Sequence, residues 1–217
     1  MSTILFIDTT QEICQLGLLH EGQLIIEQHT VERQHAAVIN AMITDLLDKQ
    51  HCNFEALTAI AVCAGPGSYT GIRVGIATAQ GIGFARQVPV SYFSALTLLN
   101  YQWINECNSE KGLYTSVLKA REQEVFFEMA NEKGQILMQG KHALLEALNQ
   151  LLIDYANEKM QIQTTLELQV NSKLHVQKIK EIARIDIHQW CQFFELSLLG
   201  SLDNDQGLYL KDVFINA

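Results

Sequence analysis

A glycine-rich segment at residues 65–75, Gly-Pro-Gly-Ser-Tyr-Thr-Gly-Ile-Arg-Val-Gly, joins two stretches of different character. The apolar run before it, residues 58–64, predicts a buried strand, and residues 70–86 after it predict a helix. The first turn of a helix leaves backbone N–H groups free, so a turn of this kind can bind an anion. Its glycine spacing matches neither the dinucleotide-binding fingerprint nor the phosphate-binding P-loop. A tight structural turn is therefore the favoured interpretation.

The helix predicted at residues 70–86 carries a stripe of small residues on one side. Its members recur every four residues, at Gly71, Gly75, Ala79 and Gly83. Each glycine inside a helix costs up to about 1 kcal/mol relative to alanine, so a close contact is expected to offset this cost. Small side chains allow a neighbour to approach the helix backbone closely. That neighbour is a helix of this chain, predicted at residues 33–49, or a partner protein, or both on opposite faces of the helix. Spacing alone does not assign the faces.

The remaining pattern predicts a mixed α/β chain with two lobes. Short strands are predicted at residues 3–7, 13–19, 23–28 and 88–92, and then again at residues 114–118, 124–129 and 162–170. Helices are predicted at residues 142–157, 172–182 and 188–199, and a late extended segment at residues 208–210. A polar stretch near residues 105–112 separates the halves. We therefore expect an N-terminal lobe at residues 1–104, a smaller lobe at 105–205, and residues 206–217 packed back on the first.

Charge and composition exclude several classes of protein. The net charge is −9, with 15 basic against 24 acidic residues, which argues against a protein that grips nucleic acid by itself. The five cysteines include no Cys-x-x-Cys pair, so reduced cytosol is expected rather than a disulfide framework or a zinc site. The apolar run at residues 4–7 is too short for a signal peptide, and no stretch approaches the roughly 20 residues that span a bilayer.

The polar residues suggest few catalytic sites. None of the seven histidines forms a His-x-x-x-His pair, so no metal site is predicted. Asp8-Thr9-Thr10 closes the first predicted strand, where an aspartate can hold a metal or orient a nucleotide phosphate. The commoner role of such an aspartate is to cap the following turn, and this alternative stays open.

Several motifs together resemble the TsaB (YeaZ) family. The most specific is Ala-Gly-Pro-Gly-Ser-Tyr-Thr-Gly-Ile-Arg-Val-Gly at residues 64–75, joined by Ile-Asp-Thr-Thr at residues 7–10 and by Arg33-x-His35. Val-Pro-Val at residues 88–90, Glu-Val-Phe at 124–126 and Leu-Tyr-Leu-Lys-Asp at 208–212 agree with the same family. The resemblance is strong over residues 1 to about 100 and patchy afterwards.

The resemblance implies a two-lobed fold of the actin-like ATPase superfamily (ASKHA, ribonuclease H-like), with a mixed sheet and helices in each lobe. It implies a non-catalytic scaffold or activating subunit that binds TsaD, its catalytic relative, as a heterodimer through the N-terminal helices. With the ATPase TsaE, that complex transfers a threonylcarbamoyl group to the adenosine next to the anticodon of tRNAs reading ANN codons. The chain would meet tRNA only through the complex, in the cytoplasm, away from membranes and without a cofactor of its own.

Spacing and resemblance together select two sets of residues and no catalytic or metal-binding ones. The expected partner-binding set lies on the two N-terminal helices: His35, Ile39, Met42, Ile43, Leu46, Gly71, Arg73, Gly75, Ile76, Ala79 and Gly83. A vestigial nucleotide or phosphate site is expected at the strand end and the glycine-rich turn: Asp8, Thr9, Thr10, Gly67 and Ser68.

Two alternatives to the scaffold interpretation remain. The chain is an ATP-binding or ATP-hydrolysing, sugar-kinase-like protein that uses Asp8 and the 65–71 turn, or it forms a homodimer through the same helices when TsaD is absent. The sequence of the second lobe argues against the kinase alternative. A nucleotide cleft needs a glycine where the backbone approaches the adenosine closely, and no glycine occurs between Gly140 and Gly200. Residues 119–121 are Lys-Ala-Arg, where family members commonly carry an aspartate.

Overall fold

The computed structural model describes residues 2–30, 34–155, 157–165, 176–182 and 184–198. These residues form two compact units, one from the described residues up to Ala95 together with Ile187–Leu198, and one from the described residues of Leu96–Asp186. Each unit contains a five-stranded mixed sheet with helices, which confirms the two-lobed α/β architecture. The division follows Ala95 rather than residue 104, and the segment at 187–198 joins the first unit. Residues 206–217, predicted to pack on the first lobe, lie outside the described residues.

The sheet of the first unit combines a hairpin meander with two parallel strands. Its order is β3-β2-β1-β4-β5, formed by β3 (Gln23–Thr30), β2 (Ile13–His20), β1 (Thr3–Asp8), β4 (Ala59–Cys63) and β5 (Val90–Phe93). Strands β1, β2 and β3 pair antiparallel, whereas β4 pairs parallel with both β1 and β5. The β2–β3 turn places Glu21 and Gly22 at φ 50° and 80°, the backbone form that two-residue hairpins favour.

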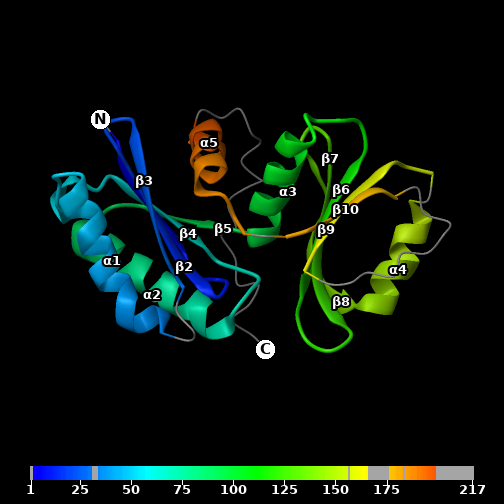
Figure 1. The fold of residues 1–217 in the computed structure, drawn as a ribbon, viewed down its shortest axis with the longest axis horizontal. Coiled ribbons are helices and arrows are strands. Elements are labelled where there is room, and N and C mark those ends of the chain that lie inside the picture. The colour runs from blue at the N-terminus through cyan, green and yellow to red at the C-terminus, as the bar shows by residue number, and fades with distance from the viewer. Residues whose placement is uncertain (1, 31–33, 156, 166–175, 183, 199–217) are drawn as a thin grey trace. The chain divides into compact units, whose positions relative to one another are not determined.

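Helices cover both faces of this sheet, as Figure 1 shows. Helices α1 (His35–Lys49) and α2 (Tyr69–Arg86) lie on one face and α5 (Ile187–Leu198) on the other; a short 3₁₀ turn spans Phe54–Ala56. The alternation of side chains along β1 explains the two layers. Leu5 and Ile7 belong to the core beneath α1 and α2, whereas the ring of Phe6 packs edge-on against Trp190 of α5 at 5.4 Å.

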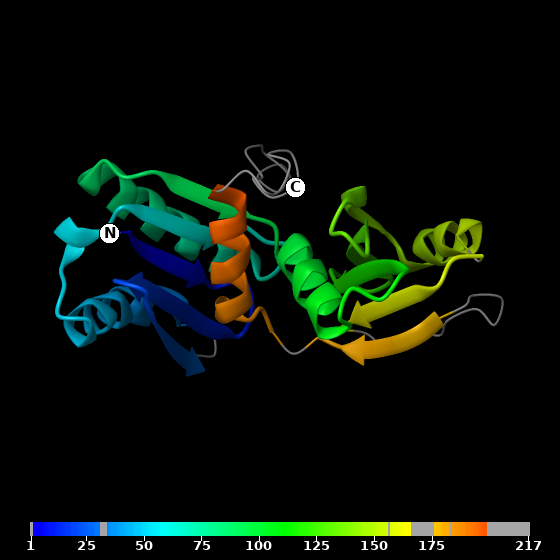
Figure 2. The same ribbon diagram turned by 90° about the horizontal axis from the view of Figure 1, so that it is seen from above.

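The second unit repeats this layering with a different chain path. Its sheet has the order β10-β9-β6-β7-β8, formed by β10 (Val176–Glu181), β9 (Met160–Thr164), β6 (Leu113–Lys119), β7 (Glu124–Asn131) and β8 (Ile136–Leu144). Helix α3 (Ala95–Glu106) lies on one face and α4 (Leu145–Asp154) on the other, as Figure 2 shows. The α4 side is apolar, with Leu148 and Leu152 packed among the strands. The α3 side includes buried polar residues.

Three element predictions in this unit need correction. The helix predicted at residues 142–157 begins only at Leu145, because the preceding residues pair with β7 as strand β8. The helix predicted at 172–182 is wrong over Val176–Glu181, which pairs in parallel with β9; sheet hydrogen bonding outweighs local helix propensity there. Helix α3 was not predicted at all. Within the described part of the chain, no helix combines the length and the apolar character that crossing a membrane requires.

Candidate functional site

The glycine-rich turn packs directly on the backbone that follows β1. Ser68 N donates to Thr10 O at 2.7 Å, and Thr9 Oγ1 donates to Gly71 O at 2.7 Å. A Cβ added to Gly67 would lie 2.3 Å from Thr10 O, and one added to Gly71 would lie 1.9 Å from Thr9 O. Because both obstacles are backbone oxygens, no side chain fits at either position without moving the chain. The two glycines are therefore explained by contact within the unit.

Asp8 and Ser68 use their side chains to complete this same turn. The Asp8 side chain is buried, and its Oδ1 accepts from Thr10 N at 2.9 Å and from Thr10 Oγ1 at 2.7 Å. Burial raises the pKa of Asp8, while the hydrogen bonds from Thr10 and the charge of His35 oppose the rise. Ser68 Oγ caps α2 by accepting from Gly71 N at 3.2 Å. The structure thus brings the five residues of the predicted nucleotide site together, with polar atoms that bind one another.

The small-residue stripe of α2 faces the sheet of its own unit. Gly71, Gly75, Ala79 and Gly83 are all buried. A Cβ on Gly75 would lie 2.4 Å from Thr9 Oγ1, and one on Gly83 would lie 2.4 Å from Val90 Cγ2. The close approach that offsets the glycine cost is therefore made by Thr9, directly after β1, and by β5. These four positions are corrected from partner-binding to core residues.

The predicted partner-binding residues of α1 are buried as well. Five side chains are each at most 7% exposed: His35, Ile39, Met42, Ile43 and Leu46. The four apolar ones belong to the core shared with the sheet. They too are corrected from a partner contact to core positions. Of the predicted set, Arg73 is exposed and Ile76 is half-buried, so these two remain available to a partner. The face of α1 that water reaches instead carries small and polar residues, including Ala37, Asn40, Ala41 and Thr44.

The opposite side of α2 presents a different surface, which we call the exposed α2 face. It consists of Tyr69, Arg73, Ala77, Gln80, Gly81 and Phe84. Phe84 is 89% exposed and Tyr69 is 55% exposed, values that are high for aromatic side chains. The Arg73 guanidinium lies over the Tyr69 ring, with its Cζ 4.0 Å from the ring centre. Sequence reasoning missed Tyr69 and Phe84, although both lie on the side of the helix away from the glycines.

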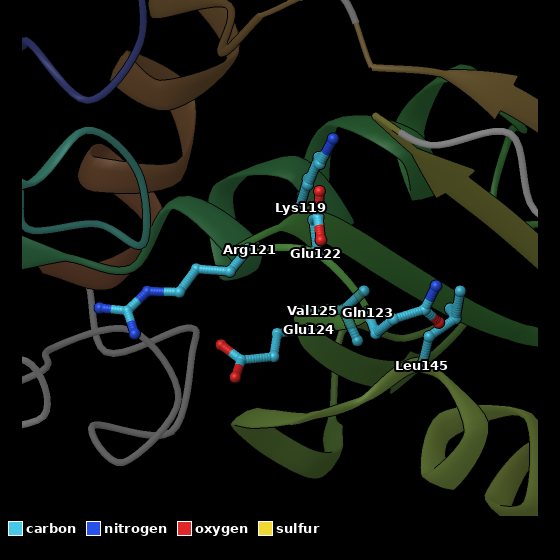
Figure 3. Close-up of a pocket in the computed structure, with 7 residues that line it drawn as sticks. All are labelled: Lys119, Arg121, Glu122, Gln123, Glu124, Val125 and Leu145. Carbon is cyan, nitrogen blue, oxygen red and sulfur yellow. The ribbon is translucent and has the colours of Figure 1, made fainter.

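A shallow pocket of about 480 Å³ lies on the second unit at the β6–β7 turn (Figure 3). Its lining mixes two basic and two acidic side chains with three uncharged ones: Lys119, Arg121, Glu122, Gln123, Glu124, Val125 and Leu145. His142 Nε2 lies 3.0 Å from Glu124 Oε2, so that carboxylate already has a partner. The part of the chain that the structure describes contains no group of three side chains able to hold a metal ion. The pocket carries no chemistry that points to a reaction.

Comparison with known proteins identifies the family to which this architecture belongs. The layered sheets define a two-lobed α/β protein, and a family model described as "TsaD: tRNA N6-adenosine threonylcarbamoyltransferase" matches residues 25–181. The chain therefore belongs to this TsaD family. Within it, the chain is similar to tRNA threonylcarbamoyladenosine biosynthesis proteins TsaB, with 34% identity over 125 residues to that of Haemophilus influenzae and 28% over 184 residues to that of Bacillus subtilis. The resemblance to TsaB (YeaZ) that the motifs predicted is confirmed.

The extent of these matches differs between relatives. The Haemophilus match covers 58% of this chain and 52% of the relative, so the chain spans about half the length of that protein; the Bacillus match covers 83% and 76%. Among solved structures, YeaZ from Pseudomonas aeruginosa superposes with a TM-score of 0.72 at 24% identity, over 96% of this chain and 95% of that one. A second Pseudomonas aeruginosa structure, described as similar to peptidase YeaZ, gives a TM-score of 0.73 at 25% identity, covering 97% and 100%.

Proposed function

We propose that this chain is a non-catalytic scaffold or activating subunit in tRNA threonylcarbamoyladenosine biosynthesis. In this role it binds a TsaD-type catalytic subunit in the cytoplasm, works alongside TsaE, and meets tRNA through the assembled complex. The proposal is supported by membership of the TsaD family and by similarity to proteins named for this pathway. The acidic charge of the chain agrees with an indirect contact with tRNA.

The exposed α2 face is the surface that we propose for TsaD. The single observation that carries this assignment is Phe84, which is 89% exposed on a helix whose other side is packed on the sheet. Burying a phenylalanine side chain in a partner would contribute about 1.5–3 kcal/mol, which is the size of an interface hot spot. Tyr69 and Arg73 add an aromatic ring and a guanidinium that already stack on each other, and both residue types are enriched in interfaces.

Gly81 supplies a second feature of this face. Among the described residues, a Cβ at Gly81 would meet nothing within 4 Å, so no contact that the structure describes explains a glycine in the middle of α2. A partner that approaches the helix backbone would explain it, because only glycine leaves that space open. Without TsaD, the same face is where we place self-association of the chain.

The ATP-binding alternative receives less support from the site. An anion at the start of α2 would compete with Ser68 Oγ for Gly71 N, and Asp8 Oδ1 already accepts two hydrogen bonds from Thr10. Calorimetry of the intact chain with ATP and magnesium tests this alternative. Saturable heat in the wild type would favour the nucleotide function over the scaffold.

The scaffold proposal is tested by pairing the chain with TsaD from the same cell. Phe84→Glu should weaken the complex by about 10-fold or more, since a desolvated hot-spot side chain becomes a charge. Leu137→Glu is the matched control, because Leu137 is 44% exposed on β8 of the other unit. It should bind like the wild type. Affinity by calorimetry and sizing of the product give the readout, with thermal unfolding to show that both variants fold.

Unchanged TsaD affinity in a folded Phe84→Glu variant would remove the exposed α2 face from the interface. Absence of any complex between the wild-type chain and its TsaD would refute the scaffold function itself. Sizing each variant without TsaD tests the homodimer alternative. If the chain self-associates through this face, Phe84→Glu should make it monomeric and Leu137→Glu should not.

A further inference from the structure

A buried carboxyl group links α3 to the sheet of the second unit. Glu128 of β7 is fully buried, with an exposed fraction of 0%. Thr97 Oγ1 lies 3.1 Å from Glu128 Oε2, and Asn100 Nδ2 lies 3.3 Å from both Oε1 and the backbone oxygen of Glu128. Both partners are residues of α3, so a single glutamate binds the helix at two successive turns.

The hydrogen bonds around Glu128 continue across the sheet to β6 and β9, and each donor and acceptor role in this chain of bonds is defined. Gln163 Nε2 of β9 donates to Ser116 Oγ at 2.7 Å and also to Leu99 O of α3 at 2.6 Å. Ser116 Oγ of β6 in turn donates to Asn100 Oδ1 at 2.6 Å. Because Asn100 accepts through its oxygen, its Nδ2 must point its two protons at Glu128. The network therefore fixes Glu128 Oε1 as a hydrogen-bond acceptor.

This polarity determines where a proton on Glu128 would lie. With Oε1 occupied as an acceptor, the carboxyl proton belongs on Oε2, which faces Thr97 Oγ1. A hydroxyl either donates or accepts, so Thr97 can accept from the neutral acid and donate to the carboxylate. The neutral form fits the site without any buried charge, whereas the ionised form places a charge among neutral partners.

We propose that Glu128 is a proton-controlled latch on α3, which holds the helix firmly as a neutral acid and loosens it when the carboxyl ionises. Burial raises the pKa of Glu128 to about 7, and hydrogen bonds from Thr97, Asn100 and the Gly140 backbone oppose this rise. Titratable side chains on the described elements around it are Tyr101, Glu106, Tyr114, Lys119, Glu124, Lys141 and His142. None of these is among the causes that shift the pKa of Glu128.

The sign of the pH dependence follows from the raised pKa. Opening of α3 exposes the carboxyl to water and returns its pKa toward the ordinary value of 4.5. The closed form therefore binds the proton more tightly, so the latch is complete below about pH 4.5 and is lost as the pH rises through about 7. Between pH 5.5 and 8 this difference corresponds to an increase of about 30-fold in the opening equilibrium of α3.

Amide hydrogen exchange of the full chain measures this opening directly. After correction for the intrinsic pH dependence of exchange, the opening equilibrium of α3 amides should rise about 30-fold from pH 5.5 to 8 in the wild type. Glu128→Gln keeps the shape but cannot ionise, so its profile should be flat. Glu122→Gln removes the same charge at an exposed position and should behave like the wild type.

Either of two results would overturn the latch: a flat wild-type profile, or a Glu128→Gln profile that keeps the wild-type rise. A ¹³C titration of the Glu128 carboxyl in the wild type decides the matter if Glu128→Gln fails to fold. A midpoint near 7 supports the latch, and a midpoint near 4.5 refutes it. Neither result depends on TsaD binding, so this inference and the scaffold function stand or fall separately.

Discussion

Replacing Gly81 with alanine should stabilise the chain. Gly81 lies in the middle of α2 and is exposed, and an added Cβ would meet no atom of the described residues within 4 Å. The substitution therefore removes the backbone entropy cost of a helical glycine without introducing a clash. The expected gain in the free energy of unfolding is about 0.8–1 kcal/mol, which for a chain of this size raises the Tm by about 2–4 °C.

Gly71→Ala is the matched change in the same helix, with the opposite expected sign. Its Cβ would lie 1.9 Å from the backbone oxygen of Thr9, and this oxygen cannot move aside as a flexible side chain would. The shift needed would also disturb the hydrogen bond from Thr9 Oγ1 to Gly71 O. Overpacking of this kind typically costs about 1–3 kcal/mol, more than the gain in helix propensity.

Urea unfolding followed by circular dichroism compares the two variants with the wild type. Opposite signs are expected, and equal signs would refute the assignment of the two faces of α2. A loss of stability in Gly81→Ala would mean that this backbone is in contact within the free chain. If instead Gly81→Ala is stabilised while its affinity for TsaD falls, the open space at Gly81 serves the partner rather than the fold.

Three further substitutions test other parts of the first unit. Ser68→Ala removes the cap on Gly71 N and should lower the free energy of unfolding by about 1 kcal/mol in urea titration; no change would mean that the cap is dispensable. The Trp190 ring packs edge-on against Phe6 at 5.4 Å and Phe93 at 5.6 Å. Trp190→Ala should therefore lower the free energy of unfolding by about 3–5 kcal/mol in the same assay. A decrease under 1 kcal/mol would contradict this packing. Asp8→Asn keeps an acceptor for Thr10 but cannot ionise. Because burial raises the pKa of Asp8, the wild type loses stability as pH rises through that pKa, so the variant should gain relative to it between pH 4 and 8; a constant difference would contradict this.

The first unit could largely be predicted because its signals are local. Residues 70–86 were predicted as a helix and α2 spans Tyr69–Arg86, with Ser68 as a cap at its start. The helix predicted at residues 33–49 is α1, His35–Lys49. Apolar runs with a turn at Glu21 and Gly22 also identified the first hairpin. Where strand alternation, turn residues and helix caps agree, the pattern of a single sequence is sufficient.

The second unit was harder because long-range pairing and buried polar groups obscure the pattern. Residues 95–100 of α3 are all buried, and they include Thr97 and Asn100, whose polar side chains bind Glu128. A helix buried around much of its surface, with polar residues inside, shows no clear apolar stripe. Strand β10 is defined by pairing with β9, a contact that local propensity does not report.

The faces of α2 mark the limit of what periodicity can decide about function. A four-residue stripe of glycine and alanine indicates a close contact, yet a sheet and a partner helix require the same stripe. The distance of 1.9 Å from a Gly71 Cβ to Thr9 O assigns the contact to the chain's own strand end. It follows that Ala79→Arg, which places a charge at a fully buried position, should unfold the unit rather than test docking. Phe84→Glu changes a side chain that is 89% exposed, so a loss of binding in a folded variant reports on the partner. Comparing the two variants by urea unfolding and by TsaD affinity separates the face that makes the fold from the face proposed to make the complex.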